Sequence, residues 1–340
     1  MTSTRRALIT GVTGQDGWYL SQLLIADGYQ VYGLVHDADA APVPDDVIAI
    51  TGDLSDAVDV QDAVNCALPN EVYNLGGVSS VALSWEQPLH TAEVTGLGFL
   101  RVITGVQALA AARDMQVRVV QASSAEIFGA AAGPQSETSP LAPVTPYGAA
   151  KAFAHQLAHV YRAGGLSIST AILYNHESPR RPETFVTRKI TRTVAKIARG
   201  EADRLPLGNL ETRRDWGYAG DYARALQLIG RHRAADDFVV ATGQSHSIAD
   251  FVATAFRRVG ITDWRPLVEV NPQFQRPIDS PEQRGDSTKI RRELGWQPAK
   301  GFEDMVNEMV DADLQLIGNV PQVASPSWHQ PRPGAGDVVP

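Results

Sequence analysis

Tyr147 and Lys151 have a spacing suited to proton transfer. They lie four positions apart in the segment TPYGAAK, which places both side chains on one face of a predicted helix. A lysine cation close to a phenol favours the phenolate, so we expect Lys151 to lower the pKa of Tyr147 toward working pH. Tyr147 would then take the proton of a substrate hydroxyl group while a hydride leaves the same carbon.

The segment QASSAEIFG adds a hydroxyl group and a carboxylate at the end of a predicted strand. Ser124 could hydrogen-bond the oxygen that Tyr147 deprotonates. A simple alcohol dehydrogenase needs no carboxylate at Glu126, but a dehydratase does. Oxidation at one carbon makes the neighbouring C–H group acidic, and one carboxyl group can remove that proton and then protonate the departing hydroxyl group. The alternative is that Glu126 has a structural role in capping or ion pairing.

Three glycines follow the first predicted strand in ALITGVTGQDGWYL and open the next helix. Gly11, Gly14 and Gly17 let the backbone turn tightly and approach a pyrophosphate, which then lies at the helix N-terminus. The strand before this loop and the helix after it predict a dinucleotide site. The spacing G-x-x-G-x-x-G is that of short-chain dehydrogenases, in which residues equivalent to Asp53 and Leu54 contact the adenine.

The end of the second predicted strand indicates which nicotinamide cofactor binds. An acidic residue about 20 residues past the glycines binds a ribose 2′-hydroxyl group, whereas an arginine binds a 2′-phosphate. The chain reads His36-Asp37 there and has no Lys or Arg between Arg6 and Arg101. Because a 2′-phosphate would find almost no cation in this part of the chain, the sequence favours NAD over NADP. The alternative is that these acidic residues only solvate a loop.

Strand-like and helix-like segments alternate through the first half of the chain. The predicted strands are at 6–11, 30–36, 47–53, 71–77 and 117–124, and the first helix is at 16–28. This order predicts an α/β fold of the Rossmann type, a doubly wound parallel sheet with helices on both faces.

The second half is richer in loops and contains predicted helices at 185–200, 221–232, 247–260 and 302–318. We therefore expect a dinucleotide-binding domain that carries the catalytic residues over 1–174. A smaller C-terminal substrate lobe would follow over 175–318, with some segments returning to the first domain. The Pro/Gly-rich tail over 319–340 is expected to be poorly ordered.

The composition excludes several classes of protein. A net charge of −8 argues against non-specific nucleic-acid binding. No apolar run is expected to reach membrane-spanning length, and we predict no metal site. The single cysteine, Cys66, excludes an internal disulfide and fits a reducing compartment, so a cytoplasmic protein is expected. Cys66 lies in a helix-like run and is predicted to be buried.

The segment YNHESPRRPETFVTRKIT at 174–191 is basic within an acidic chain. A local basic patch fits a small anionic ligand better than a nucleic acid. Guanidinium groups bind pyrophosphate oxygens in pairs, and a lysine adds a point charge. The alternative is a solvated cationic surface.

From about residue 5 to residue 315 the chain resembles the GDP-mannose 4,6-dehydratase family of extended short-chain dehydrogenases. The segments that carry the resemblance are those quoted above together with EVYNLGGVSSVALSWEQP, LGNLETRRDWGYAGDY and VATGQSHSIADFV. The resemblance implies that GDP-mannose is converted to GDP-4-keto-6-deoxymannose by a nicotinamide cofactor that is reduced and reoxidised in each turnover.

The resemblance also implies residue roles. Tyr147 would deprotonate the mannose 4-hydroxyl, Ser124 would hold the 4-oxygen, Glu126 would remove the C5 proton, and Lys151 would position the cofactor ribose. The implied cofactor-binding residues are Gly11, Thr13, Gly14, Gln15, Asp16, Gly17, His36, Asp37, Asp53, Leu54, Leu75, Gly76, Tyr147, Lys151, Asn175 and His176. The implied substrate-binding residues are Ser80, Ser84, Asn175, Glu177, Arg180, Val186, Lys189, Leu207, Gly208, Arg214, Arg276 and Asp279.

The chain departs from the family pattern at several positions. His36-Asp37 stands where the family has two arginines, in a shortened loop that in the family helps to bind NADP and reaches a neighbouring subunit. Pro182 replaces a glycine. The segment RPIDSPEQRGD keeps Arg276 and the acidic Asp279 but changes the apolar and acidic residues that follow.

A homo-oligomer, either a dimer or a tetramer, is expected from the resemblance. Its interface would be formed by the helix preceding QASS and the helix that contains Tyr147. Two other functions stay open. An NAD-dependent epimerase or 4-reductase acting on a GDP-sugar would use Tyr147 and Lys151 without Glu126, and a nucleotide-sensing homologue would have no catalysis.

Overall fold

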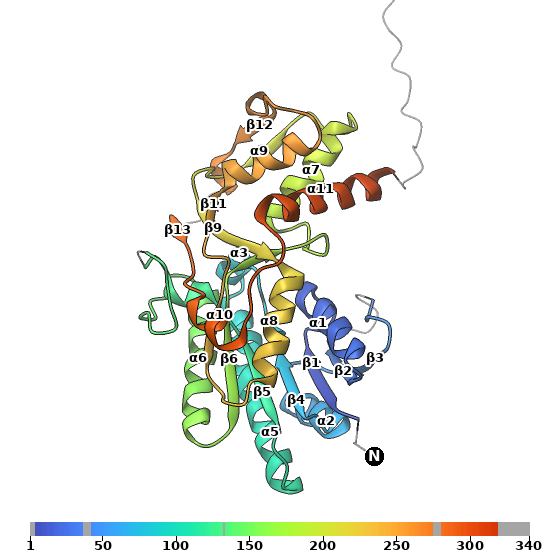
Figure 1. The fold of residues 1–340 in the computed structure, drawn as a ribbon, viewed down its shortest axis with the longest axis vertical. Coiled ribbons are helices and arrows are strands. Elements are labelled where there is room, and N and C mark those ends of the chain that lie inside the picture. The colour runs from blue at the N-terminus through green and yellow to red at the C-terminus, as the bar shows by residue number, and fades with distance from the viewer. Residues whose placement is uncertain (1–3, 37–41, 132, 275–279, 319–340) are drawn as a thin grey trace, which may run out of the picture.

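The computed structural model describes residues 4–36, 42–131, 133–274 and 280–318. Its centre is a seven-stranded sheet in the order β10-β6-β5-β4-β1-β2-β3 (Figure 1). All six strand pairs are parallel. The strands are β1 (Arg6–Thr10), β2 (Gln30–Val35), β3 (Val47–Thr51), β4 (Glu71–Asn74), β5 (Arg118–Ser124), β6 (Ser167–Leu173) and β10 (Asp237–Val240). The predicted Rossmann-type fold is confirmed.

Helices cover both faces of this sheet because its strands are apolar on both sides. Along β1, Leu8 belongs to one buried cluster, whereas Ala7 and Ile9 belong to the other. Successive side chains of a strand point to opposite faces, so each face needs its own cover. One face carries α1 (Gln15–Ala26), α8 (Ala219–Arg231) and α10 (Thr288–Leu294), and the other carries α2 (Ala57–Ala67), α5 (Gly98–Arg113) and α6 (Pro146–Ala163).

A smaller part lies above the carboxyl ends of the strands (Figure 1). A separate apolar cluster joins its three main helices, α7 (Val186–Ala198), α9 (Ile248–Arg258) and α11 (Phe302–Gly318). Its short strands are β7 (Asn175–Glu177), β8 (Leu205–Leu207), β9 (Arg213–Tyr218), β11 (Ser245–Ser247), β12 (Val268–Val270) and β13 (Glu282–Gln283). Strand β9 pairs with β7, β11 and β13 and so connects segments far apart in the chain.

Short helices complete the described part of the chain. They are α3 (Val81–Glu86), α4 (Pro88–Thr91), the π-helix η1 (Ala92–Leu97), and the 3-10 helices η2 (Ala125–Phe128), η3 (Arg265–Leu267) and η4 (Pro272–Phe274). The tail expected to be poorly ordered lies outside the described residues.

Two expectations about the helices are wrong. Cys66 is exposed on α2, because Val60, Ala63, Val64 and Ala67 are the residues of that helix that face the core.

The second error concerns membrane-spanning length. The continuous helical segment Pro88–Arg113 is long and apolar enough to cross a membrane, with a mean hydropathy of 1.5. Half of its most apolar 18-residue stretch is buried inside the protein. Phe99, Val102 and Ile103 pack in the apolar cluster on the face of the sheet that α5 covers. Its length and composition are therefore those of a core helix of the α/β fold.

Candidate active site

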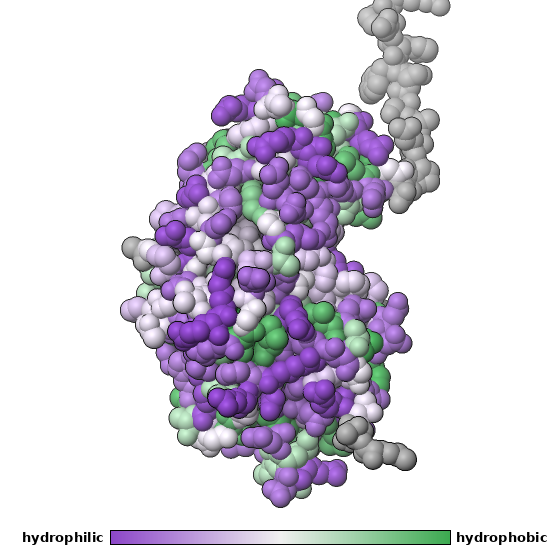
Figure 2. Space-filling view, in the orientation of Figure 1, coloured by the Kyte–Doolittle hydropathy of each residue, from purple (hydrophilic) through white to green (hydrophobic). Residues whose placement is uncertain are grey.

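The predicted catalytic residues meet at the carboxyl ends of the central strands. Ser124 ends β5, Glu126 lies in η2 directly after it, and Tyr147 and Lys151 lie in the first turns of α6. Ligands of open α/β sheets bind at this edge, next to the point where the strand order reverses. The surface is hollowed between the sheet and the smaller part of the molecule (Figure 2).

Ser124, Tyr147 and Lys151 are held by different contacts. Ser124 is 9% exposed, and its side chain hydrogen-bonds Tyr147 and accepts the backbone N–H of Glu126 at 3.2 Å. Lys151 is buried and donates to the backbone carbonyl of Ala122 in β5 at 2.7 Å. Its Nζ lies 5.8 Å from the centre of the Tyr147 ring. The ammonium group thus lies over the ring.

Burial has the largest effect on the acidities of this group. It raises the pKa of Tyr147 to about 12, against a lowering by the Ser124 hydrogen bond and the Arg181 cation, and the Glu126 charge raises it further. Burial also lowers the pKa of Lys151 to about 8. The expectation that Lys151 lowers the pKa of Tyr147 is therefore wrong for this structure, in which Arg181 is the cation that does so.

Glu126 extends the site toward the smaller part of the molecule. Its side chain is partly exposed, and its charge acts on Tyr147. Its Oε1 accepts a hydrogen bond from Nε2 of Gln283 at 3.2 Å. The carboxylate is therefore not turned into the protein interior, and it shares the site with the phenol.

The glycine-rich loop has the geometry of a pyrophosphate cradle. Gly11 has a positive φ of 71°, and a Cβ there would lie 2.9 Å from the backbone of Gly76. A Cβ at Gly17 would lie 2.4 Å from the carbonyl oxygen of Gly11. The N-cap of α1 is Gly14, and no described side chain caps this helix end. Its first N–H groups are therefore available to an anion, as a dinucleotide requires.

The other residues expected to bind a cofactor line the same sheet edge. They follow β1 (Thr13, Gln15, Asp16), β2 (His36), β3 (Asp53, Leu54) and β4 (Leu75, Gly76), with Asn175 and His176 in β7. Asp37 lies outside the described residues. This set fits a dinucleotide laid across the ends of adjacent strands.

Asp16 and His176 join the first helix to β7. His176 Nε2 lies 2.9 Å from Asp16 Oδ2, and its Nδ1 donates to the carbonyl of Tyr174 at 2.7 Å. Burial lowers the pKa of His176, but the charge and hydrogen bond of Asp16 outweigh it, so the net pKa is raised. Gln15 adds hydrogen bonds to the His176 carbonyl at 3.0 Å and from Ser178 at 2.8 Å. These contacts position the basic segment relative to the glycine loop.

Arg181 is a site residue that the sequence did not single out. Its Nε lies 3.1 Å from Oε2 of the buried Glu177, and its guanidinium stacks on Phe185 at 3.7 Å from the ring centre. Its charge lowers the pKa of both Tyr147 and Asp16. Arg180 instead stacks on Trp18. Only the fold distinguishes the two adjacent arginines, because their sequence context is the same.

The expected substrate residues separate by exposure. At least partly exposed are Ser80, Asn175, Arg180, Val186, Lys189 and Gly208. Buried are Ser84, Glu177, Leu207 and Arg214. Arg276 and Asp279 lie outside the described residues.

Two of the buried groups already have partners. The hydroxyl group of Ser84 donates to the carbonyl of Val81 at 2.7 Å. The Glu177 carboxylate accepts from Thr187 at 2.7 Å and pairs with Arg181. The structure therefore does not present Ser84 or Glu177 to a substrate, and Glu177 instead holds the arginine in place.

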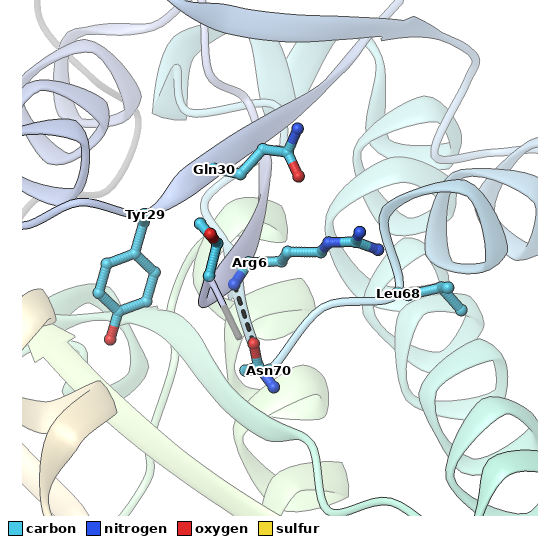
Figure 3. Close-up of a pocket in the computed structure, with 6 residues that line it drawn as sticks. Arg6, Tyr29, Gln30, Leu68 and Asn70 are labelled. Carbon is cyan, nitrogen blue, oxygen red and sulfur yellow. Dashed lines mark hydrogen bonds between the residues drawn. The ribbon is translucent and has the colours of Figure 1, made fainter. Parts of the chain in front are cut away.

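The pocket in Figure 3 lies at the opposite edge of the sheet. It is lined by Thr4, Arg6, Tyr29, Gln30, Leu68 and Asn70. Arg6 and Gln30 begin their strands, whereas the catalytic residues follow the strand ends. No residue expected to be catalytic lines this pocket, so it does not belong to the candidate active site.

His155, His159 and Asp237 form one possible metal-ligand group in the described part of the chain, with ligand atoms within 4.8 Å of one another. Asp237 already binds His159 at 2.6 Å, Arg162 at 2.5 Å and Thr170 at 2.6 Å. Burial raises the pKa of Asp237, but the Arg162 contact outweighs it, and the pKa is about 2. Because the arginine occupies the carboxylate, we interpret this group as a polar link between α6 and β10.

Comparisons with known proteins agree with this geometry. A family profile described as GDP-mannose 4,6 dehydratase matches residues 8–309. GDP-mannose 4,6 dehydratase 1 of Arabidopsis thaliana is 42% identical over 325 residues, covering 91% of this chain and 90% of its own. The GDP-mannose 4,6 dehydratase of Homo sapiens is 38% identical over 347 residues, covering 93% of both.

Solved structures extend the comparison to the fold. The UDP-glucose 4-epimerase of Thermus thermophilus, solved with NAD, superposes with a TM-score of 0.80 at 26% identity. The match covers 91% of this chain and 98% of the epimerase.

Proposed function

The chain belongs to the GDP-mannose 4,6-dehydratase family, and on this premise we propose that it converts GDP-mannose to GDP-4-keto-6-deoxymannose with loss of water. The observation that carries the proposal is the position of Glu126 beside Tyr147 and Ser124. An epimerase or a 4-reductase needs the phenol but not the carboxylate, whereas an elimination needs both.

The side chains divide the proton transfers between them. Tyr147 takes the proton of the mannose 4-hydroxyl, and Ser124 hydrogen-bonds the 4-oxygen. When bound, a nicotinamide cofactor would supply the hydride acceptor for C4 and the hydride donor for C6. Glu126 removes the C5 proton and passes it to the C6 hydroxyl, which leaves as water. Hydride addition at C6 leaves an enolate of the 4-ketone, and the proton that Tyr147 took from the 4-hydroxyl balances the reprotonation of C5. Because Ser124 and Arg181 lower the pKa of Tyr147, they are the groups that favour the phenolate.

The basic segment supplies the charge that a nucleotide diphosphate needs. Arg180 and Lys189 are accessible on the substrate side, and each lies over an aromatic ring, at 4.3 Å from Trp18 and 3.5 Å from Phe274. Cations held in this way keep their charge while losing little conformational freedom on binding. We propose that the smaller part of the molecule, residues 175–318, binds the GDP-sugar through these groups.

We further propose NAD as the cofactor. His36 follows β2, and its Nε2 lies 3.4 Å from Oδ2 of Asp53. Burial raises the pKa of Asp53, but the hydrogen bonds of Ser55 and the charge of His36 outweigh it, so this carboxyl group favours its charged form. A 2′-phosphate at this strand end would be repelled by the negative charge of Asp53. Mass spectrometry of the nucleotide released from the purified protein tests the proposal, and recovery of NADP alone would contradict it.

Incubation of the purified protein with GDP-mannose tests the main proposal. We expect a keto sugar, detected by its ultraviolet absorbance in alkali, with no net consumption of nicotinamide. Recovery of unchanged GDP-mannose, or of an epimer that keeps its 6-hydroxyl group, would refute the dehydratase.

We also propose a homodimer, through α6 as expected from the sequence but with α3 and α4 in place of α5, the helix that precedes QASS, because no large apolar residue is exposed on α5, which the structure describes in full. Four large apolar side chains are exposed there, namely Trp85 at 40%, Leu89 at 86%, Phe153 at 44% and Val160 at 64%. These helices contact one another, and an apolar face of this kind is typical of an association surface.

The exposed Cys66 fits a protein of the reducing cytoplasm.

Charge substitution tests this interface. The variant Phe153→Asp should elute as a monomer in size-exclusion chromatography, because a carboxylate would be buried in the contact. Val58→Asp is a matched control, since Val58 is 67% exposed on α2, away from that face. A wild-type protein that elutes as a monomer at micromolar concentration would contradict the proposal.

A further inference from the structure

Gln283 reaches the catalytic carboxylate from a distant part of the chain. It lies in β13, beside β9 at the junction of the two parts of the molecule (Figure 1). Its Nε2 donates to Oε1 of Glu126 at 3.2 Å across a separation of 157 residues. The Gln283 side chain is therefore a direct neighbour of the group to which the elimination is assigned.

The backbone around Gln283 is fixed on both sides. The carbonyl of Pro281 accepts the N–H of Arg213 at 2.9 Å, and the carbonyl of Arg284 accepts the N–H of Gln135 at 2.9 Å. The N–H of Gly285 donates to the Asp215 carboxylate at 3.3 Å. A segment anchored in this way can hold a side chain in one place.

The other end of the Gln283 amide has no hydrogen-bond partner within the described ranges. The residue is 2% exposed, and its buried Oε1 accepts no hydrogen bond from the described residues. Leaving a buried acceptor unpaired is destabilising, and an apolar side chain of the same shape would avoid this cost. Stability alone therefore does not explain an amide here, whereas the contact with Glu126 does.

We propose that Gln283 is a positioning residue for Glu126 that holds its carboxyl group in both protonation states. This inference rests on the proposed dehydratase function. The charged carboxylate accepts a hydrogen bond, and the Gln283 amide donates one in the observed arrangement. The neutral acid donates, and a half-turn of the amide about its last torsion presents the unpaired Oε1 as an acceptor.

The Gln283 amide would change from donor to acceptor and back as Glu126 gains and loses the proton during the elimination. The C5–H bond breaks, its proton passes to Glu126, and its electron pair forms the C5–C6 double bond as the C6–O bond breaks. The proton then passes from Glu126 to the departing hydroxyl group, which leaves as water. Glu126 is thus charged, neutral and charged again. Tyr147 is the other titratable group assigned to the reacting sugar, and the Gln283 amide donates to the Glu126 carboxylate.

The substitution Gln283→Met tests the inference, because methionine keeps the length of the side chain and removes the amide. We expect kcat for keto-sugar formation to fall by about 10- to 100-fold, the scale of a slightly misplaced catalytic group. KM for GDP-mannose should stay within about 2-fold. Oxidation at C4 should keep its rate, so absorbance of the reduced nicotinamide should build up during turnover.

Three comparisons separate positioning from a structural role. The melting temperature of Gln283→Met should not fall, since the unpaired acceptor is removed. Gln283→Leu makes the same test with a second side chain. Gln244→Met makes the same exchange at an exposed position outside the site and should behave as wild type.

The inference is overturned if Gln283→Met eliminates water at the wild-type rate. It is also overturned if C4 oxidation and elimination slow equally while the melting temperature falls. Failure of the proposed function is a separate result, because wild-type protein would then form no keto sugar from GDP-mannose.

Discussion

Asp313 holds a buried ion pair that connects α11 to the basic segment. Its side chain is fully buried, and its carboxylate binds Arg188 through Nε and Nη2 at 2.8–3.1 Å and accepts from Thr191 at 2.7 Å. Nη1 of Arg188 in turn donates to the carbonyls of Pro179 and Arg181. We therefore expect Asp313→Asn to weaken both the fold and the substrate side of the site.

The magnitude follows from the burial of both partners. Removing one charge of a buried pair leaves the other uncompensated and costs about 3–5 kcal/mol. With an unfolding entropy of about 2.1 cal/mol/K per residue, a chain of 340 residues has about 0.7 kcal/mol/K. The melting temperature should then fall by about 4–7 °C.

Calorimetry of wild type and Asp313→Asn measures the shift, and KM for GDP-mannose measures the effect on the site. We expect KM to rise more than kcat falls, because the Arg188 contacts hold the loop that bears Arg180 and Arg181. The double variant Arg188→Met/Asp313→Leu is the control. It removes both charges of the pair, so part of the lost stability should return, while Arg192, whose Nη1 lies 3.7 Å from Asp313 Oδ1, still loses its partner.

Two results would refute this reasoning. One is a melting temperature of Asp313→Asn within about 1 °C of wild type, which would mean that the pair has no net effect on stability. The other is a double variant less stable than Asp313→Asn, which would mean that packing rather than charge is what Asp313 contributes.

Three other perturbations address the site itself. Tyr147→Phe should lower kcat by about 10²- to 10⁴-fold with unchanged nucleotide binding by titration calorimetry, and wild-type turnover would contradict its assigned role. Glu126→Gln should stop formation of the 4-keto-6-deoxy sugar while a single oxidation at C4 still reduces the nicotinamide, and loss of water at the wild-type rate would contradict the role of Glu126. His176 has a pKa raised by Asp16, so its stabilising contact is fully present below the ordinary histidine pKa of about 6.5 and is lost as pH rises through the raised pKa. Asp16→Asn should therefore lower the melting temperature most near pH 6, with the difference from wild type shrinking at alkaline pH, and a difference independent of pH would count against the ion pair.

Local patterns in the sequence were sufficient for the sheet, the glycine loop and the grouping of Tyr147 with Lys151. Each depends on neighbours within a few residues or on the alternation of strand and helix. The positive φ of Gly11 and the close approach of Gly17 to the backbone of Gly11 and Val12 follow from glycine at those positions. The parallel order of the strands follows from the helices that separate them.

The acidities and the support of the site depended on the tertiary structure. The pKa of Tyr147 is raised by burial, which no spacing reveals, and Arg181 rather than Lys151 is the cation that lowers it. Gln283 meets Glu126 across 157 residues, and Gln15 meets His176 across 161. A short motif can therefore indicate which groups can react. Desolvation and long-range contacts decide how those groups are charged and held, and they exist only once the chain has folded.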